Sequence, residues 1–197
     1  MFVNKDQVKQ WVINFNQKIH ENKAYLITLD TPIGDGDHGA NMARGMQAVT
    51  DEMAKQQPET VNDILKLVAM QLISNVGGAS GPLYGTAFLN MSKQSQTTDD
   101  FSTWVKEGLA GIQKRGKAEV GEKTMVDMWQ FVLESLENHQ LSTESIDNFI
   151  EQSKALKATK GRASYVGDRS IGHIDPGTYS SGLLFKAYLE VVGDTNE

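Results

Sequence analysis

Three aspartates within eight residues form the part of the sequence whose chemistry is most readily defined. Asp30, Asp35 and Asp37 lie in the stretch LDTPIGDGDHGAN, where glycines separate them before a helical pattern begins. Three ionised carboxylates held this close in a folded loop repel one another unless a cation neutralises them. Mg²⁺ uses carboxylate oxygens together with substrate phosphates as ligands. The spacing therefore predicts a site for metal and phosphate.

Two other interpretations of this stretch fit less well. An EF-hand loop needs Gly at its sixth position and Glu at its twelfth. Counting from Asp30 gives Asp35 and Asn41 there, and counting from Asp35 gives Met46 at the twelfth position. An Asp- and Gly-rich surface turn is the second alternative, because these residues are common in turns. Turns seldom hold three acids and a histidine, here His38, at the start of a helix.

Length and composition limit the class of protein. The 197 residues predict a single domain over residues 1–197 with a substantial core. A net charge of −6 offers no basic face for nucleic acid or for an anionic membrane. The absence of cysteine excludes disulfides, zinc–thiolate sites and thiol nucleophiles. Without a signal-peptide core or a membrane-spanning apolar run, we expect a soluble cytoplasmic protein.

Apolar residues recur at helical spacing along most of the chain, and no segment shows convincing strand alternation. Residues 24–29 are apolar but too few for periodicity to distinguish helix from strand. The pattern predicts an all-α protein of about eight helices. The expected helices cover approximately residues 4–19, 42–57, 60–76, 83–94, 99–116, 125–138, 142–156 and the segment after residue 178.

Three further loops contain more glycine or charge than helix connections require. Residues 77–81 could expose backbone N–H groups to phosphate, although a Gly-rich helix end is an equally ordinary interpretation. Residues 114–125 mix both charge signs and are typical of a solvated connection. Residues 161–177 are too long for a simple connection, which favours a functional loop. His38 lies in the acidic stretch and His173 in residues 161–177, and a loop histidine most often serves as a hydrogen-bonding group.

Four motifs, taken in order, resemble the nucleotide-binding L subunit of dihydroxyacetone kinase. They are GDGDHG at residues 34–39, GGASG at 77–81, RGKA with KTM at 115–118 and 123–125, and GHIDPG at 172–177. Their order is that of the family, and together they span essentially the whole chain. The resemblance implies a barrel of eight antiparallel helices, with the nucleotide bound among the loops at one end.

The resemblance also implies roles for individual residues. Asp30, Asp35 and Asp37 match the ligands of two Mg²⁺ ions that bridge the phosphates of ADP or ATP. Arg162 matches an arginine that faces the transferred phosphoryl group, which implies a catalytic role. The other nucleotide contacts that the resemblance implies are His38, Gly39, Ala40, Asn41, Ala79, Ser80, Gly116, Met125, Asp175, Pro176 and Gly177.

Family membership implies partners as well. In the phosphotransferase-dependent bacterial branch, ADP stays bound, a phosphohistidine carrier (M) subunit recharges it, and a K subunit holds dihydroxyacetone on its own histidine. His38 is therefore not expected to be a nucleophile. In the ATP-dependent branch the same domain is fused to a K domain, so the length of this chain favours a separate subunit. The family also includes subunits that contact a transcriptional regulator.

Two alternatives and two departures from the family pattern remain open. Fatty-acid kinases carry a similar N-terminal domain, but in a much longer chain with a lipid-carrying partner. A nucleotide-sensing module without catalysis is the other alternative. Glu122 replaces a common Asp, a change expected to matter little. Tyr179 replaces a small residue, which leaves the packing beside the nucleotide open.

Overall fold

The computed structural model describes residues 3–195, which form nine α-helices and one 3-10 helix, with no β-strand among them. The all-α expectation is therefore confirmed. The elements are α1 Lys5–Glu21, α2 Lys23–Asp30, α3 His38–Gln56, α4 Val61–Asn75, α5 Ser80–Gln94, α6 Phe101–Gly116, α7 Met125–Glu137, α8 Thr143–Ser153, η1 Arg162–Ser170 and α9 Pro176–Val192.

Two segments are more helical than the sequence pattern indicates. The unassigned apolar piece is α2, which Asn22 alone separates from α1 through a break in the helical backbone (φ −101°, ψ 7°). The long segment expected as a loop contains η1 and the start of α9. Gly161 and Gly167 have positive φ angles of 67° and 58°, so η1 is an irregular helix that periodicity does not reveal.

Side-chain caps explain where most helices begin. Asn4, Thr60 and Ser142 accept hydrogen bonds from backbone N–H groups in the first turns of α1, α4 and α8, at the positions where the sequence predicts these helices to begin. The first turns of α7 and α9 are capped by Thr124 and Asp175. In contrast, α3 and α5 have no side-chain cap. The amide groups at those two helix ends therefore lack a side-chain partner from their own N-cap residue.

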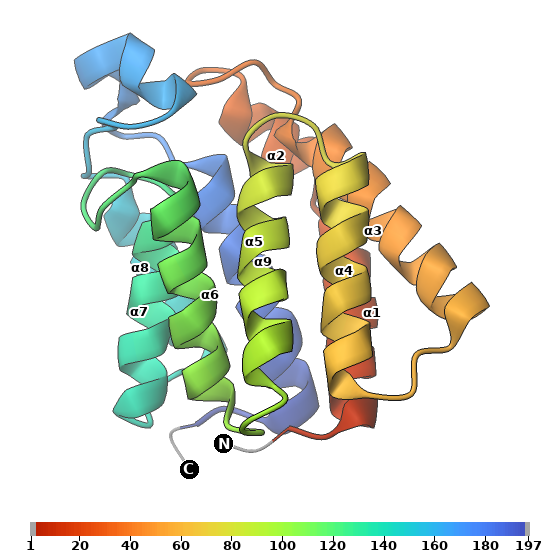
Figure 1. The fold of residues 1–197 in the computed structure, drawn as a ribbon. Coiled ribbons are helices and arrows are strands. Elements are labelled where there is room, and N and C mark those ends of the chain that lie inside the picture. The colour runs from red at the N-terminus through yellow and green to blue at the C-terminus, as the bar shows by residue number, and fades with distance from the viewer. Residues whose placement is uncertain (1–2, 196–197) are drawn as a thin grey trace.

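The helices pack as a closed series of neighbours (Figure 1). Helix α1 contacts α3 and α9, consecutive helices contact one another from α3 to α7, and α7 contacts α9. The connections run back and forth between two ends, so the N-termini of α3, α5, α7 and α9 lie at the upper end of Figure 1. No helix in the described part of the chain is long and apolar enough to cross a lipid bilayer.

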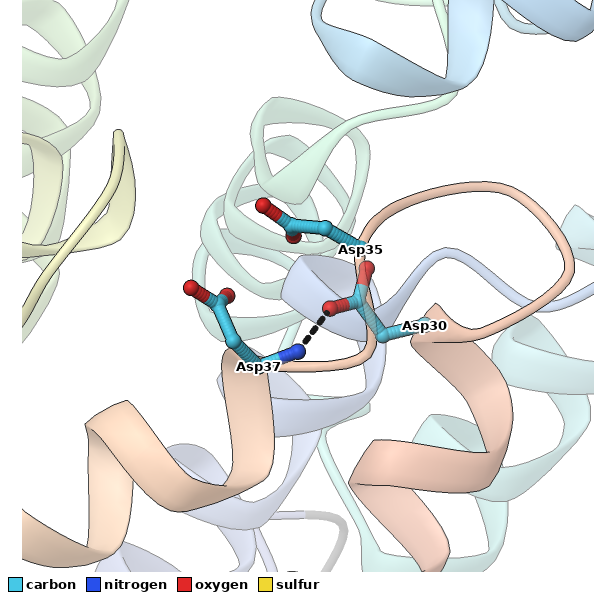
Figure 2. A group of neighbouring side chains, drawn as sticks. All are labelled: Asp30, Asp35 and Asp37. Carbon is cyan, nitrogen blue, oxygen red and sulfur yellow. Dashed lines mark hydrogen bonds between the residues drawn. The ribbon is translucent and has the colours of Figure 1, made fainter.

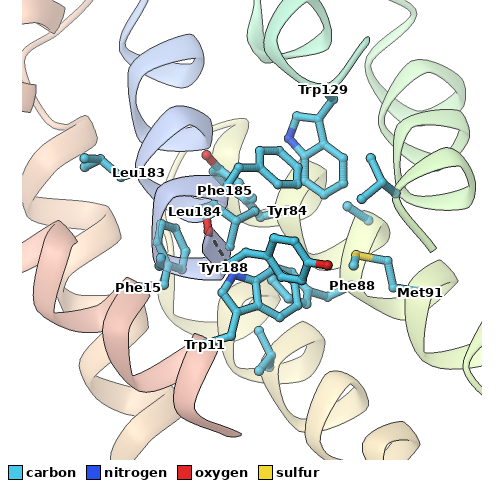
Figure 3. Packing of buried hydrophobic residues seen from close by; sticks show 14 of the residues in the cluster. Trp11, Phe15, Tyr84, Phe88, Met91, Trp129, Leu183, Leu184, Phe185 and Tyr188 are labelled. Atoms are coloured by element: carbon cyan, nitrogen blue, oxygen red, sulfur yellow. Dashed lines mark hydrogen bonds between the residues drawn. The ribbon is translucent and has the colours of Figure 1, made fainter. Parts of the chain in front are cut away.

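A dense aromatic core fixes these helices relative to one another (Figure 3). The fully buried Trp11 of α1 donates from Nε1 to the carbonyl oxygen of Leu184 in α9 over 2.8 Å. Phe101 of α6 stacks on Tyr188 of α9 with ring centroids 3.7 Å apart. Aromatic pairs of this kind add about 0.5–1.5 kcal/mol each beyond their buried area. The core therefore holds the helix ends in a defined arrangement.

Candidate metal and phosphate site

The acidic loop brings its three carboxylates together (Figure 2). Asp30 ends α2, Asp37 precedes α3, and Asp35 lies between them. Each offers one oxygen to a group whose members lie within 4.8 Å of one another. Asp30 is only 7% exposed, and its Oδ2 accepts from the N–H groups of Asp37 (2.9 Å) and His38 (3.1 Å). These bonds hold the Asp30 carboxylate against the start of α3.

Glycine at position 34 is required by this arrangement. A Cβ atom there would lie 2.0 Å from Oδ1 of Asp30, which is far inside van der Waals contact. The Gly34 N–H donates to the carbonyl oxygen of Asp30, so the loop backbone folds directly onto that residue. Gly36 has a positive φ of 74°, which other residues rarely adopt. The glycine spacing seen in the sequence is thus what lets the carboxylates converge.

The donor set suits a hard divalent cation. It consists of carboxylate oxygens alone, which favour Mg²⁺ or Ca²⁺ over softer metals. Opposite oxygens in an octahedral Mg²⁺ site are about 4.2 Å apart, because each Mg–O bond is about 2.1 Å long. The 4.8 Å grouping is therefore close to what such an ion requires.

A cavity of about 350 Å³ opens beside the acidic loop. The first residues of α3, α5, α7 and α9 all line it: His38, Ser80, Met125 and Pro176. The N-terminus of an α-helix carries about half a positive charge and free N–H groups. Four such ends around one cavity favour an anion, and phosphate is a common ligand of this kind.

The uncapped ends of α3 and α5 have amide groups suited to phosphate. In α3 the first hydrogen bond back to the preceding turn runs from the Asn41 N–H to the Asp37 carbonyl oxygen over 2.9 Å. In α5 it runs from the Leu83 N–H to the Ala79 carbonyl oxygen over 3.1 Å. Amides before these positions have no acceptor within their own helix. Gly78, with φ 66°, turns the chain directly ahead of α5.

His38 is held from both sides of its ring. It is 7% exposed, with Nδ1 3.0 Å from the Ser80 hydroxyl and Nε2 2.9 Å from the Ser180 hydroxyl. Burial lowers the pKa of His38 to about 4, and the nearby Asp30 charge opposes this shift. The imidazole is therefore neutral near pH 7. It can serve as a hydrogen-bonding group at the cavity wall, which agrees with the expectation from the sequence.

A second cavity of about 350 Å³ adjoins the first and is more apolar in its lining. The two share several lining residues, among them Ala79, Leu83 and Met125. Ile112 and Gly116 belong to the second cavity alone, and a Cβ on Gly116 would lie 3.0 Å from a methyl carbon of Leu83. The combined space therefore has a polar compartment beside an apolar one. Such an arrangement suits a molecule with an anionic group such as phosphate joined to a less polar part.

Arg162 reaches the acidic loop from the start of η1. Its Nη1 lies 3.1 Å from Oδ2 of Asp35, and both side chains are open to solvent, at 69% and 38% exposure. Arg162 also lines the first cavity. An exposed ion pair of this kind contributes little to stability. The guanidinium is therefore available to an anion that enters beside Asp35.

Lys123 lines the same cavity but directs its charge elsewhere. Its side chain is almost fully buried, and Nζ donates to the carbonyl oxygens of Ser153, Lys154 and Leu156 at 3.4, 3.2 and 2.9 Å. These carbonyls lie at and just after the C-terminus of α8, where a cation is favourable. Burial lowers the pKa of Lys123, opposed by the charges of Asp175 and Asp127. Lys123 thus tethers the segment that leads to η1.

Most of the residues singled out in the sequence meet at these cavities. The three aspartates line the first cavity, while Gly116 lines the second and Met125 lines both. Gly39 and Ala40 line neither cavity. A Cβ atom on Gly39 would lie 2.3 Å from the Lys23 carbonyl oxygen. Gly39 therefore serves the packing of α3 against α2. The remaining expected residues that line the first cavity are His38, Asn41, Ala79, Ser80, Arg162, Asp175, Pro176 and Gly177.

The structure also shows where the side chains of Tyr179 and His173 lie, and it adds two cavity residues that the sequence did not indicate. Tyr179 turns away from the cavities, donating to Oδ1 of Asn22 over 3.0 Å. His173 is exposed and lines neither cavity. Leu83 and Lys160 line both cavities although sequence patterns did not single them out. A leucine in a helix and a lysine in a loop carry no distinctive signal, so only the tertiary structure identifies them.

Comparison with known proteins identifies the family of this chain. Residues 32–190 match the family model described as the DAK2 domain. The chain is 57% identical over 187 residues to the "PTS-dependent dihydroxyacetone kinase, ADP-binding subunit DhaL" of Lactococcus lactis, covering 95% of this chain and 97% of that protein. It is 38% identical over 196 residues to the "PEP-dependent dihydroxyacetone kinase, ADP-binding subunit DhaL" of Escherichia coli, covering 91% and 93%.

The fold is also similar to a larger solved protein. The dihydroxyacetone kinase of C. freundii superimposes with a TM-score of 0.78 at 24% identity, over 95% of this chain. A structure of that kinase in complex with AMP-PNP and Mg²⁺ gives a TM-score of 0.77 at 23% identity. This chain spans only about a third of the C. freundii chain, 35% and 34% in the two structures.

Fold and cavity together define an all-helical domain with one end suited to a phosphate-bearing ligand and a divalent cation. The chain belongs to the DAK2-domain family, and the motif resemblance to the L subunit of dihydroxyacetone kinase is confirmed.

The carboxylate cluster predicts strict dependence on Asp35. Replacing Asp35 with Asn removes one anionic oxygen from the group, so Mg²⁺-dependent binding of ADP should weaken on the order of 100-fold or more in titration calorimetry. Asp51→Asn, which neutralises an exposed carboxylate elsewhere on α3, should leave the affinity unchanged. Wild-type affinity in the Asp35→Asn variant would contradict the metal assignment.

Asp175 predicts a pH-dependent stability. Burial raises the pKa of Asp175 to about 6, with hydrogen bonds from Thr178 opposing the shift, the Asp127 charge adding to it and the Lys123 charge opposing it. A carboxyl whose pKa is higher in the folded state loses its stabilising contribution as pH rises from its unfolded value, about 4, through about 6. Over this window the unfolding free energy of wild type should fall by up to about 3 kcal/mol relative to Asp175→Asn.

This difference is measurable by denaturant unfolding of both proteins from pH 4 to 8 without ligand. Asn at position 175 retains an oxygen that can accept from the Thr178 N–H, so the cap of α9 is kept. Above about pH 6 the two curves should run parallel. Parallel curves across the whole range would show that Asp175 titrates normally.

Proposed function

We propose that the chain is the ADP-binding subunit of a phosphoenolpyruvate-dependent dihydroxyacetone kinase. It would hold ADP while a phosphohistidine carrier subunit delivers a phosphoryl group, and dihydroxyacetone on a K subunit would receive that group to give dihydroxyacetone phosphate. The observation that carries the proposal is the convergence of three carboxylates and four helix N-termini on one cavity. Relatives that bear this subunit name match over nearly their whole length.

The cavities suggest how the nucleotide would be held. Asp30, Asp35 and Asp37 would bind two Mg²⁺ ions, which when present neutralise the phosphate charge and polarise the phosphoryl oxygens. The first turns of α3 and α5, with Ser80, would bind the phosphates through N–H and O–H donors. The adenine would lie in the apolar compartment beside Met125.

The remaining implied contacts have related roles in this proposal. Gly39 and Ala40 would contribute through backbone amides of the first turn of α3, because their side-chain positions do not line the cavities. Residues 175–177 would contact the nucleotide from the start of α9. Phosphoryl transfer demands mainly positioning and the neutralisation of spread negative charge. An acidic chain can supply both locally, through bound cations and helix ends.

We propose that residues 1–197 act as a single nucleotide-binding domain. Its partners would be the dihydroxyacetone-binding K subunit and the phosphohistidine carrier (M) subunit of the phosphotransferase system in the cytoplasm. The names of the relatives, which describe a subunit of a kinase, support an assembly of this kind. A contact with a transcriptional regulator would be an additional role of the same subunit.

Reconstitution distinguishes this function from its alternatives. The purified chain is mixed with a K subunit and dihydroxyacetone, and product is compared between free ATP and a phosphoenolpyruvate-driven carrier relay. We expect product with the relay and little with ATP alone. Product with ATP alone would instead indicate an ATP-dependent kinase subunit. Nucleotide binding without transfer under either condition would indicate a nucleotide-sensing module.

Arg162 should affect transfer more than binding. Its exposed guanidinium lines the cavity beside Asp35, where it can stabilise charge on a phosphoryl group in transit. In the reconstituted relay, Arg162→Ala should reduce turnover on the order of 10³-fold. ADP affinity should change little. Arg169→Ala, which removes an exposed arginine of the same 3-10 helix outside both cavities, should behave as wild type. Equal losses in the two variants would argue against a specific role for Arg162.

A further inference from the structure

A series of hydrogen bonds leads from the first cavity into the core. The Ser80 hydroxyl, at the cavity wall, is 3.0 Å from Nδ1 of His38. Nε2 of His38 is 2.9 Å from the hydroxyl of Ser180 in α9. Ser180 is fully buried, so the ring of His38 connects a group that can meet a ligand with one that cannot.

The series continues beyond Ser180. The hydroxyl of Tyr84, one turn after Ser80 in α5, lies 2.7 Å from Ser180 Oγ and 2.9 Å from Ser181 Oγ. Nε1 of Trp129 in α7 donates to Ser181 Oγ over 3.2 Å. Tyr84, Ser181 and Trp129 are all fully buried. We name these six side chains, from Trp129 to Ser80, the hydroxyl series; they come from α3, α5, α7 and α9, the helices whose N-termini line the cavity.

The direction of the series can be traced from its inner end. An indole N–H can only donate, so Ser181 Oγ accepts from Trp129. The only other hydrogen bond of the Ser181 hydroxyl in the described part of the chain is with Tyr84. If Tyr84 donated to Ser181, the Ser181 hydrogen would be buried without an acceptor, which is costly. Ser181 therefore donates to Tyr84, and the Tyr84 hydrogen goes to Ser180.

The hydrogen-bond directions at Ser180 determine which nitrogen of His38 carries the hydrogen. Having accepted from Tyr84, the Ser180 hydroxyl can donate to Nε2 of His38 at 2.9 Å or to the Gly177 carbonyl oxygen at 3.3 Å. The contact with the Gly177 carbonyl is longer than the range of about 2.5–3.0 Å for an O–H···O hydrogen bond, so the Ser180 hydrogen goes to Nε2. Nε2 can accept it only if the single hydrogen of the neutral ring sits on Nδ1. The Nδ1–H then donates to Ser80 Oγ. The hydroxyl hydrogen of Ser80 is left free to point into the cavity.

We propose that the hydroxyl series fixes the Nδ1–H tautomer of His38 and thereby presents Ser80 to the ligand as a hydrogen-bond donor. Tyr84, Ser180 and Ser181 are then positioning residues for an anionic phosphate, although none of them reaches it. In the opposite tautomer the Ser80 hydroxyl would donate its hydrogen to Nδ1. Only its oxygen lone pairs would then face the phosphate oxygens. That the anion is a nucleotide phosphate rests on the proposed function, whereas the tautomer does not.

The tautomer is tested directly by NMR on the ¹⁵N-labelled chain without ligand. The four histidines give separate imidazole signals, and those of His38 are assigned by their loss in His38→Gln. We expect Nδ1 to carry the hydrogen and Nε2 to be the unprotonated nitrogen. Tyr84→Phe leaves Ser180 without its donor, so in this variant the ring should shift toward the Nε2–H tautomer. An Nε2–H tautomer in wild type would overturn the proposal.

Nucleotide binding tests the consequence. Tyr84→Phe should bind Mg·ADP about fivefold more weakly, as expected for one lost hydrogen bond, and should bind adenosine as wild type does. The matched control is Tyr188→Phe, which alters a buried tyrosine that stacks on Phe101 in the same core and lies outside the hydroxyl series. This control should retain wild-type affinity for Mg·ADP.

The outcomes separate the two proposals. Unchanged Mg·ADP affinity in Tyr84→Phe, or equal weakening of Mg·ADP and adenosine, would overturn the positioning role. If Tyr84→Phe does not fold, Ser180→Ala replaces it, because this variant removes the hydroxyl that donates to Nε2 of His38. Ser92→Ala is then the control for a buried serine that bonds Asn62. Failure of the wild-type chain to bind Mg·ADP would contradict the proposed function. The tautomer measurement would then still decide whether the hydroxyl series is directed as proposed.

Discussion

Mutual repulsion among Asp30, Asp35 and Asp37 is the constraint around which the site end of this protein is arranged. The loop satisfies one carboxylate through two backbone N–H groups and leaves the other two more exposed. Its backbone can approach that carboxylate only because position 34 has no side chain. Local hydrogen bonds offset part of the repulsion between these like charges, and a bound cation would offset the rest, so the loop is suited to bind one.

The helices around the loop respond to the opposite problem, the binding of an anion by a chain of net charge −6. Four helix N-termini supply positive potential without any excess of basic side chains. Of the two lysines that line the first cavity, Lys123 donates to carbonyl oxygens at and after the C-terminus of α8, and Arg162 lies at the start of the irregular helix η1. Behind the cavity wall, the hydroxyl series connects Ser80 to the buried Trp129 through hydrogen bonds. The site is therefore linked directly to the aromatic core.

Sequence patterns identified much of this arrangement, for physical reasons that differ by element. Asp30, Asp35 and Asp37 were recognisable because local spacing alone brings their carboxylates together. The helix starts at residues 4 and 60 were predicted correctly, because the capping side chains of Asn4 and Thr60 act within one turn. The helix α2 and the 3-10 helix were not, because eight residues give too little periodicity and Gly167 interrupts the second. The buried partners of His38 come from residues far away in sequence, and no local pattern encodes such contacts.

The alternation of helix direction limits how this domain can change its length. Each of α3, α5, α7 and α9 is separated from the next by one α-helix that returns the chain from the far end to the cavity end. Deleting a single intervening helix would reverse every helix that follows and bring negative C-terminal carbonyls to the cavity. Helices in this part of the chain can therefore be gained or lost only in pairs. Elongation of loops at the far end carries no such restriction, so length variation within the family should concentrate there.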